Sequence, residues 1–456
     1  MKKLGIGIAA AVAIVVVGGL GTSYVMGGKV QEGFEATAKE WSKQPLTVKV
    51  VSYERGLLSS KAQTEWTVAS GSDTLRFVAK HDISHGPLPH GHAAEVVSTF
   101  LLNDDASPEW KAAYKDQAPL VWRSTVGWSQ ASKHEITSPA FAGEFDGAKV
   151  AFGGAKAQFD MTSDLKGMKG TADFPTLQVD NPEEQSNMAL AGGAMRFDLH
   201  QPKDQEFVVG PFAMSLASLK VTSSAEAGGK PSTIEDLVMD TDTQLVGEVV
   251  NVAINTKIKS FTSPDFKATE LAMDMAMRNM DAGVMNNIAK LGQQANLEAM
   301  DPQALLMQSL QQLLARKPEI EIKRMAMRTD DGVSEVSGSL AYVGNPAQAI
   351  NPAMDVKGAV NLNLPKPVML SLFTSRVRDS YLEQMDEDSE DAATPELMEA
   401  VKADVQERLT SLVQAGLLID TNTAYTAKLN YGGGKFEAND KPLDQNGLMT
   451  LMTAMP

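Results

Sequence analysis

The chain contains no cysteine in its 456 residues. This absence excludes disulfide bonds, thiolate nucleophiles, thiolate-bound zinc and lipidation at an N-terminal cysteine. Basic residues are also in deficit, with 41 lysines and arginines against 57 acidic side chains and a formal net charge of −16. Because nucleic-acid binding needs a basic surface that contacts phosphates, we expect no nucleic-acid partner.

Histidine is scarce, and its distribution is uneven. Only six histidines occur, and four of them, His81, His85, His90 and His92, lie in the segment AKHDISHGPLPHGH. A metal site needs three or four ligands held close together. The alternation in KHDISH predicts a strand, which separates His81 from His85 by about 13 Å along the chain. Structural or loop roles are therefore favoured, and a metal site is the alternative.

Motifs typical of catalysis are missing as well. The Gly-x-Ser-x-Gly elbow does not occur, and His134-Glu135 lacks the second histidine of a His-Glu-x-x-His zinc site. The acidic run EQMDEDSEDAATPE lacks the spacing and the central glycine of an EF-hand loop. We therefore assign no catalytic, cofactor-binding or metal-binding residue, and we expect a non-enzymatic protein without a cofactor.

Charge is absent from the segment Leu4–Met26, which directly follows Lys2 and Lys3. A helix rises about 1.5 Å per residue, so about 20 apolar residues span the hydrocarbon core of a membrane. Since no Ala-x-Ala cleavage site follows, we predict an uncleaved transmembrane anchor over residues 1–28, with a cleaved signal peptide as the alternative. The two lysines favour a cytoplasmic N-terminus, which places the body, residues 29–456, across the membrane.

The body shows the alternation of apolar and polar residues that is typical of strands. Examples are LTVKV, QLVGEVVNVAINTKIKSF and KATELAMDMAMRN, and segments rich in Gly, Asn, Asp, Ser and Pro separate such runs. Regular short strands favour an antiparallel meander over βαβ units. We predict an α+β, β-dominated fold, in which one long twisted antiparallel meander sheet carries a few amphipathic helices.

Three helical segments are predicted, over about 281–317, 367–385 and 394–416. The last is the best defined, with Thr394 as its N-cap and Gly416 as its C-terminal cap. A terminal hairpin is predicted over about 422–442. The helices are too few to cover a sheet of this length, so part of its apolar face should stay open as a ligand groove or an interface.

Three stretches carry a resemblance to a known family. They are SYERGLLSS, HDISHGPLP and, near the end, QAGLLIDTNTAYTAKLNYGGGKFEANDKPL. In this order they resemble the YdgA-like family of bacterial envelope proteins over nearly the whole chain. The resemblance implies a single-pass protein of a Gram-negative inner membrane with a periplasmic body, and it implies no reaction. One turn departs from the family pattern, where Asn439-Asp440-Lys441 stands in place of Asn-Gly-Lys.

Three classes of function follow from these observations. The first is a non-enzymatic, membrane-anchored envelope protein whose body holds a lipid or another apolar ligand. The second is an envelope scaffold that self-associates as a homo-oligomer or binds a partner protein. The third, which the missing motifs disfavour, is a hydrolase with a dispersed site. Lipid bound to the purified body would separate the first class from the second.

Overall fold

The structure is a computed structural model. It describes residues 46–56, 59–70, 73–85, 92–104, 106–115, 117–183, 185–222, 230–264, 266–293, 302–345, 348, 351–384 and 394–454. The predicted anchor, residues 1–28, lies outside this part of the chain. Within the described residues, no helix has both the length and the apolar character that crossing a bilayer requires.

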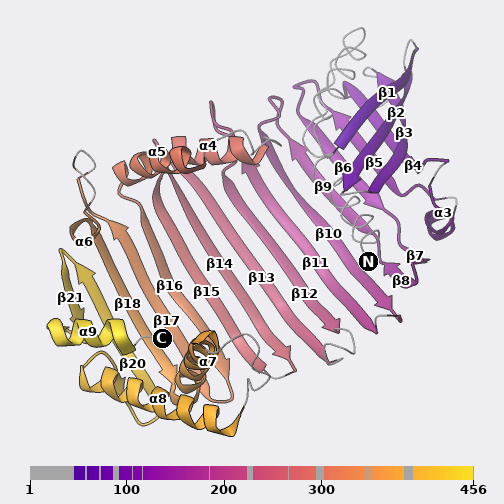
Figure 1. Cartoon of the computed structure of the whole chain (residues 1–456). Coiled ribbons are helices and arrows are strands. Elements are labelled where there is room, and N and C mark those ends of the chain that lie inside the picture. The colour runs from indigo at the N-terminus through magenta and orange to yellow at the C-terminus, as the bar shows by residue number, and fades with distance from the viewer. Residues whose placement is uncertain are drawn as a thin grey trace. The chain divides into compact units, whose positions relative to one another are not determined.

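The chain divides into two compact units, which we describe separately. Unit 1 comprises Met1–Asp242, Thr262–Asp265 and Gly292–Ala295, and unit 2 comprises Thr243–Phe261, Phe266–Leu291 and Asn296–Pro456. In both units the strands pair antiparallel, mostly with their neighbours in sequence (Figure 1). The prediction of a β-dominated antiparallel meander with a few helices is therefore confirmed.

The described residues of unit 1 form strands and one short helix. The helix is α3 (Pro108–Tyr114). The strands are β1 (Leu46–Arg55), β2 (Ser59–Ser70), β3 (Asp73–His85), β4 (Ala94–Leu102), β5 (Leu120–Val126), β6 (Ser132–Ser138), β7 (Phe141–Phe145), β8 (Ala148–Phe152), β9 (Ala155–Met161), β10 (Gly167–Asn181), β11 (Ser186–His200) and β12 (Gly210–Thr222). β13 (Pro231–Val246) crosses the boundary to unit 2.

Strand β10 has two partners along one edge. Its first half, Met168–Asp173, pairs with β9, and Leu177–Asp180 pairs with β8. Successive side chains of a strand point to opposite faces. Met168 and Ala172 pack against the core that β1–β6 and β9 enclose, whereas Leu177 and Val179 belong to a second core with β7 and β8. The apolar side of β10 thus changes faces halfway along the strand.

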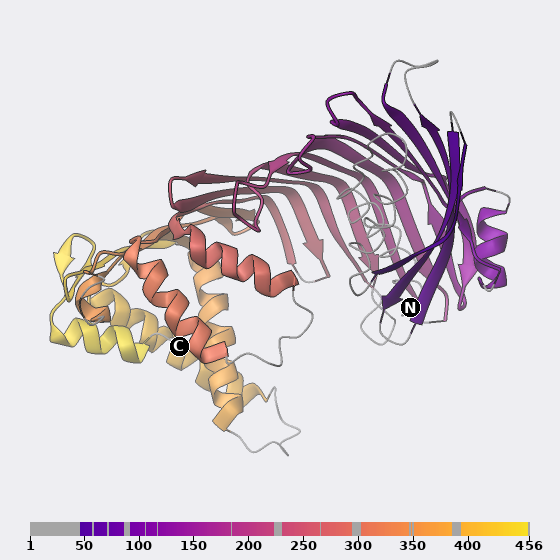
Figure 2. The same ribbon diagram turned by 90° about the horizontal axis from the view of Figure 1, so that it is seen from above.

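Unit 2 combines a sheet with most of the helices that the structure describes. Its strands are β14 (Val249–Ser263), β15 (Phe266–Asp281), β16 (Glu319–Thr329), β17 (Gly332–Tyr342), β18 (Val356–Pro365), β19 (Ile419–Asp420), β20 (Ala424–Gly432), β21 (Lys435–Ala438) and β22 (Lys441–Pro442). Its helices are α4 (Ala282–Gln293), α5 (Pro302–Ala315), α6 (Pro352–Asp355), α7 (Lys366–Gln384), α8 (Pro395–Gln414) and α9 (Gln445–Ala454). The larger helices lie on one side of this sheet (Figure 2).

The helices begin and end close to the positions that the sequence indicated. The predicted segment 281–317 contains two helices, α4 and α5, and residues 294–301 between them lie outside the described residues. The Thr394 hydroxyl accepts a hydrogen bond from the Leu397 amide at 3.2 Å, which caps α8. Gly416 follows α8 with a φ of 71°, a conformation that favours glycine. The short helices α3, α6 and α9 were not predicted.

The core of unit 2 lies where α7 and α8 meet the sheet. Val377 on α7 and Val401 and Leu409 on α8 are almost completely buried, and they pack in one cluster with Tyr425 and Ala427 of β20. Partly buried Leu362, Leu364 and Leu429 extend this cluster onto the sheet. The two helices therefore cover one end of the sheet face on which they pack.

Candidate functional site

Of the four grouped histidines, the structure describes the side chains of His81 and His92, and these two have different surroundings. His81 is buried on β3, where Nε2 lies 2.8 Å from Thr64 Oγ1 and Nδ1 lies 2.8 Å from Ser98 Oγ. Burial lowers the pKa of His81 to about 4. His92 Nε2 lies 3.9 Å from Glu95 Oε2 near the surface. His90 and the side chain of His85 lie outside the described residues.

These positions give the histidines no common centre in the described part of the chain. There, no group of three or more His, Asp or Glu side chains could hold a metal ion. His81 is instead held by hydroxyl groups of the two neighbouring strands, as expected for a buried polar side chain whose hydrogen bonds are satisfied.

A second buried imidazole belongs to His134 on β6, for which the sequence predicted no role. Its Nδ1 lies 2.9 Å from Ser124 Oγ and 3.2 Å from Trp122 Nε1, and its Nε2 lies 2.8 Å from Ser132 Oγ. The signal was present in SKHEITS, because strand alternation places Ser132, His134 and Ile136 on one face.

The surface best suited to an apolar ligand is the sheet of unit 2. Four strands, β15–β18, direct aliphatic and methionine side chains to one face. Cross-strand register aligns Met277, Ile320 and Leu340 in one row and Met275, Ile322 and Val360 in the next, with Gly338 between the last two. We call this surface the open apolar face, and it consists of Met275, Met277, Ile320, Ile322, Met325, Val336, Leu340 and Val360.

The open apolar face is incompletely covered. Ile320, Met325, Leu340 and Val360 are 41%, 44%, 54% and 42% exposed. Burial of such side chains is favourable by about 25 cal/mol of free energy per Å² of apolar surface that is removed from water. A contiguous exposed apolar patch usually marks a binding surface. The α7–α8 core begins at the neighbouring Leu362, so the covered end and the open face are parts of one apolar surface.

A β-bulge in β16 keeps this face apolar. Ile322 is opposite Gly338 and Met325 is opposite Val336, so Lys323 and Arg324 together oppose one residue of β17. The additional residue restores the alternation, because residues three apart in a regular strand point to opposite faces. Without the bulge, Met325 would lie on the other side of the sheet.

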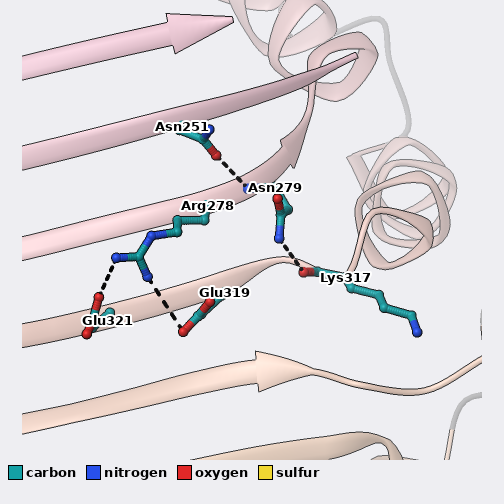
Figure 3. A network of polar contacts seen from close by, with 6 residues as sticks. All are labelled: Asn251, Arg278, Asn279, Lys317, Glu319 and Glu321. Carbon is teal, nitrogen blue, oxygen red and sulfur yellow. Dashed lines mark hydrogen bonds and ion pairs between the residues drawn. The ribbon is translucent and has the colours of Figure 1, made fainter. Parts of the chain in front are cut away.

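That other side is charged. Arg278 on β15 lies 2.6 Å from Glu321 and 3.6 Å from Glu319 on β16, as Figure 3 shows. Ala276 and Ala326, each 6% exposed, lie on this face between the long charged side chains. The sheet therefore has one charged face and one apolar face. Helices cover only part of the apolar face.

The end of β15 is fastened to its neighbours by polar contacts. The backbone nitrogen of Asn279 donates a hydrogen bond to Asn251 Oδ1 at 2.9 Å, and the side-chain Nδ2 of Asn279 donates to the Lys317 carbonyl at 3.3 Å (Figure 3). Arg316 pairs with Glu248 at 2.6 Å and with Asp281 at 3.0 Å. These contacts fix the points at which the chain leaves the sheet for α4 and returns from α5, beside the open apolar face.

Comparison with known proteins identifies a family but no individual similar protein. No curated protein and no solved structure matches the chain. One family model, described as bacterial protein of unknown function (DUF945), matches residues 1–445. Because this match covers almost the whole chain, the chain belongs to the DUF945 family of bacterial proteins.

Proposed function

We propose that this protein is a YdgA-like, single-pass envelope protein whose periplasmic body binds the acyl chain of a membrane lipid on the open apolar face. The observation that carries the proposal is the exposure of Ile320, Met325, Leu340 and Val360 on one face of a well-paired sheet. The uncharged segment Leu4–Met26 supports a location at a membrane, where acyl chains are available.

The chemistry of the face favours an aliphatic ligand. Backbone amide and carbonyl groups are used in the antiparallel ladders of β15–β18, so they do not require a partner from the ligand. The side chains offer methyl, methylene and thioether groups, and methionine adapts to irregular apolar shapes. An acyl chain needs no hydrogen bonds and gains free energy from leaving water along its whole length.

Val360 and Asn361 provide a matched test on one strand. They are adjacent on β18 and point to opposite faces, and both are exposed. A photo-crosslinking amino acid at position 360 of the full-length chain, in cells, should form adducts with acyl lipids that mass spectrometry identifies. The same crosslinker at position 361 should form none.

Substitution gives an independent readout. Val360→Asp should lower the amount of co-purified acyl lipid roughly tenfold, which corresponds to about 1.4 kcal/mol of binding free energy. Asn361→Asp, which places the new carboxylate opposite Lys428, should leave it unchanged. Equal lipid content in both variants would contradict the proposal. A crosslinked dimer formed from position 360 would instead support self-association through this face.

A further inference from the structure

The hydrogen bonds around His134 define its protonation state. An indole nitrogen can only donate a hydrogen bond. Trp122 Nε1 lies 3.2 Å from His134 Nδ1, so Nδ1 must carry the lone pair that accepts it. The proton of the imidazole then lies on Nε2, which donates to Ser132 Oγ at 2.8 Å. The neighbouring indole thus requires His134 to be neutral.

Protonation of His134 would disrupt this arrangement. An imidazolium carries a hydrogen on both nitrogens, so Nδ1–H would oppose the indole N–H of Trp122. The charge would also lie within the aromatic core, where Phe159 stacks on the His134 ring with centroids 4.7 Å apart. Burial lowers the pKa of His134 to about 4, in agreement with this geometry.

Among the described residues, the direct partners of the His134 ring provide no compensating charge. The side chains that bond to or stack on the ring are Trp122 and Ser124 from β5, Ser132 from β6 and Phe159 from β9, and none is charged. On β1–β3 the same face of the sheet carries the titratable side chains of Tyr53, Arg55 and His81. The neighbours Lys133 and Glu135 alternate to the opposite face, where Glu135 pairs with Lys156 at 2.8 Å.

We propose that His134 is an acid-sensitive switch in unit 1, whose neutral imidazole ties β5 to β6 through Trp122 and whose protonation releases Trp122 and opens this part of the sheet. Opening exposes the aromatic core around Phe100, Trp122 and Phe159, which is buried in the structure. The switch is independent of ligand binding in unit 2, and a periplasmic location would expose it to external acid.

The direct test is the pKa of His134 in the full-length protein, measured by NMR. We expect a value below 5 in the wild type and a rise of at least about one pH unit in Trp122→Phe, which lacks the indole donor; one unit corresponds to about 1.4 kcal/mol. A wild-type value near the ordinary 6.5, or no change in Trp122→Phe, would overturn the proposal.

The conformational consequence is tested with His134→Gln. The glutamine amide can accept from Trp122 and donate to Ser132, but it does not titrate. As pH falls from 7 to 4, the amide protection factors of β5 and β6, which are corrected for the intrinsic exchange rate, should decrease in the wild type before those of α8 do. In His134→Gln this decrease should begin at a lower pH. His92→Gln changes a partly exposed histidine of the same unit; it is the control and should behave as the wild type. An identical acid response of His134→Gln would contradict the switch; if that variant does not fold, the NMR measurement decides.

Discussion

The strands of unit 1 and those of unit 2 share an alternating pattern of apolar and polar residues, but they bury their apolar residues to different extents. In β3–β5 of unit 1, Ile83, Phe100 and Val126 are 1% or less exposed. In β17 and β18 of unit 2, Leu340 and Val360 are 54% and 42% exposed. An alternating pattern therefore specifies the face of a strand, while the degree of burial depends on what packs against that face.

The two units also differ in the residues and helices that give each unit its spectroscopic signal. All six histidines and all five tryptophans precede residue 201, within unit 1. Apart from α3, the described helices belong mostly to unit 2. Tryptophan fluorescence therefore follows unit 1, and the helical circular dichroism signal follows mainly unit 2, so the two regions can be compared in one sample.

The largest expected difference between the units is their response to acid. The folded pKa values of His81 and His134, about 4, lie below the ordinary 6.5, so the unfolded chain binds protons first as pH falls. The stability that neutral imidazoles contribute is complete above pH 6.5, decreases between 6.5 and 4, and is absent below 4. Each group should account for about 3 kcal/mol. Urea unfolding followed by fluorescence at several pH values measures this loss.

A pH-independent fluorescence midpoint between 6.5 and 4 would show that these imidazoles are not buried in solution. The circular dichroism transition provides the internal control, because unit 2 has no histidine.

Truncation of one large side chain in each unit should give the next largest contrast. Phe100 is 1% exposed and its ring lies 5.2 Å from that of Trp66, so Phe100→Ala should destabilise unit 1 by about 3–5 kcal/mol. Leu340→Ala should change the stability of unit 2 by less than about 1 kcal/mol, because little apolar contact is lost. Denaturation midpoints by fluorescence and by circular dichroism measure the two effects, and comparable losses would mean that the open apolar face is covered in solution.

Removal of the α8 cap should have a moderate effect on unit 2. Thr394→Ala leaves the Leu397 amide without its hydroxyl partner and should cost about 1 kcal/mol. Thr410→Ala is the matched control, since that hydroxyl bonds to the Gln406 carbonyl on the exposed side of the same helix. The control should be neutral or slightly stabilising, because alanine has the higher helix propensity. Thermal unfolding at 222 nm distinguishes the two variants.

The smallest effect is expected on the charged face of unit 2. Arg278→Gln removes the ion pairs with Glu319 and Glu321, whose side chains are 36% and 31% exposed. Exposed pairs contribute about 0–1 kcal/mol, and salt screens them. We expect a small loss at low ionic strength that disappears in about 1 M salt, where the Debye length is about 3 Å. A loss that persists in salt would indicate packing by the arginine stem.

Sequence patterns predicted the secondary structure well where a single element determines it. The period of α8 and its Thr394 cap are local, and so is the alternation that places His81 in a strand. The open apolar face was predicted only as a general consequence of too few helices. Its residues were not, because strand register is not local, and because the bulge at Lys323 interrupts the simple alternation of β16.

The buried imidazole of His134 shows another limit of sequence patterns. Metal and catalytic motifs are defined by titratable residues at fixed spacings in the sequence. The partners of His134 are hydroxyl groups and an indole, and two of them, Trp122 and Ser124, come from the neighbouring strand β5. Such a site becomes visible only when the strand pairing is known.

Strand β10 has a consequence for how unit 1 unfolds. Its 15 residues supply Met168 and Ala172 to one core and Leu177 and Val179 to the other, on opposite faces of the sheet. If β10 leaves the sheet, both cores lose apolar contacts at the same time. The two cores should therefore unfold as one cooperative unit, so their protected amides should exchange with the same free energy of opening.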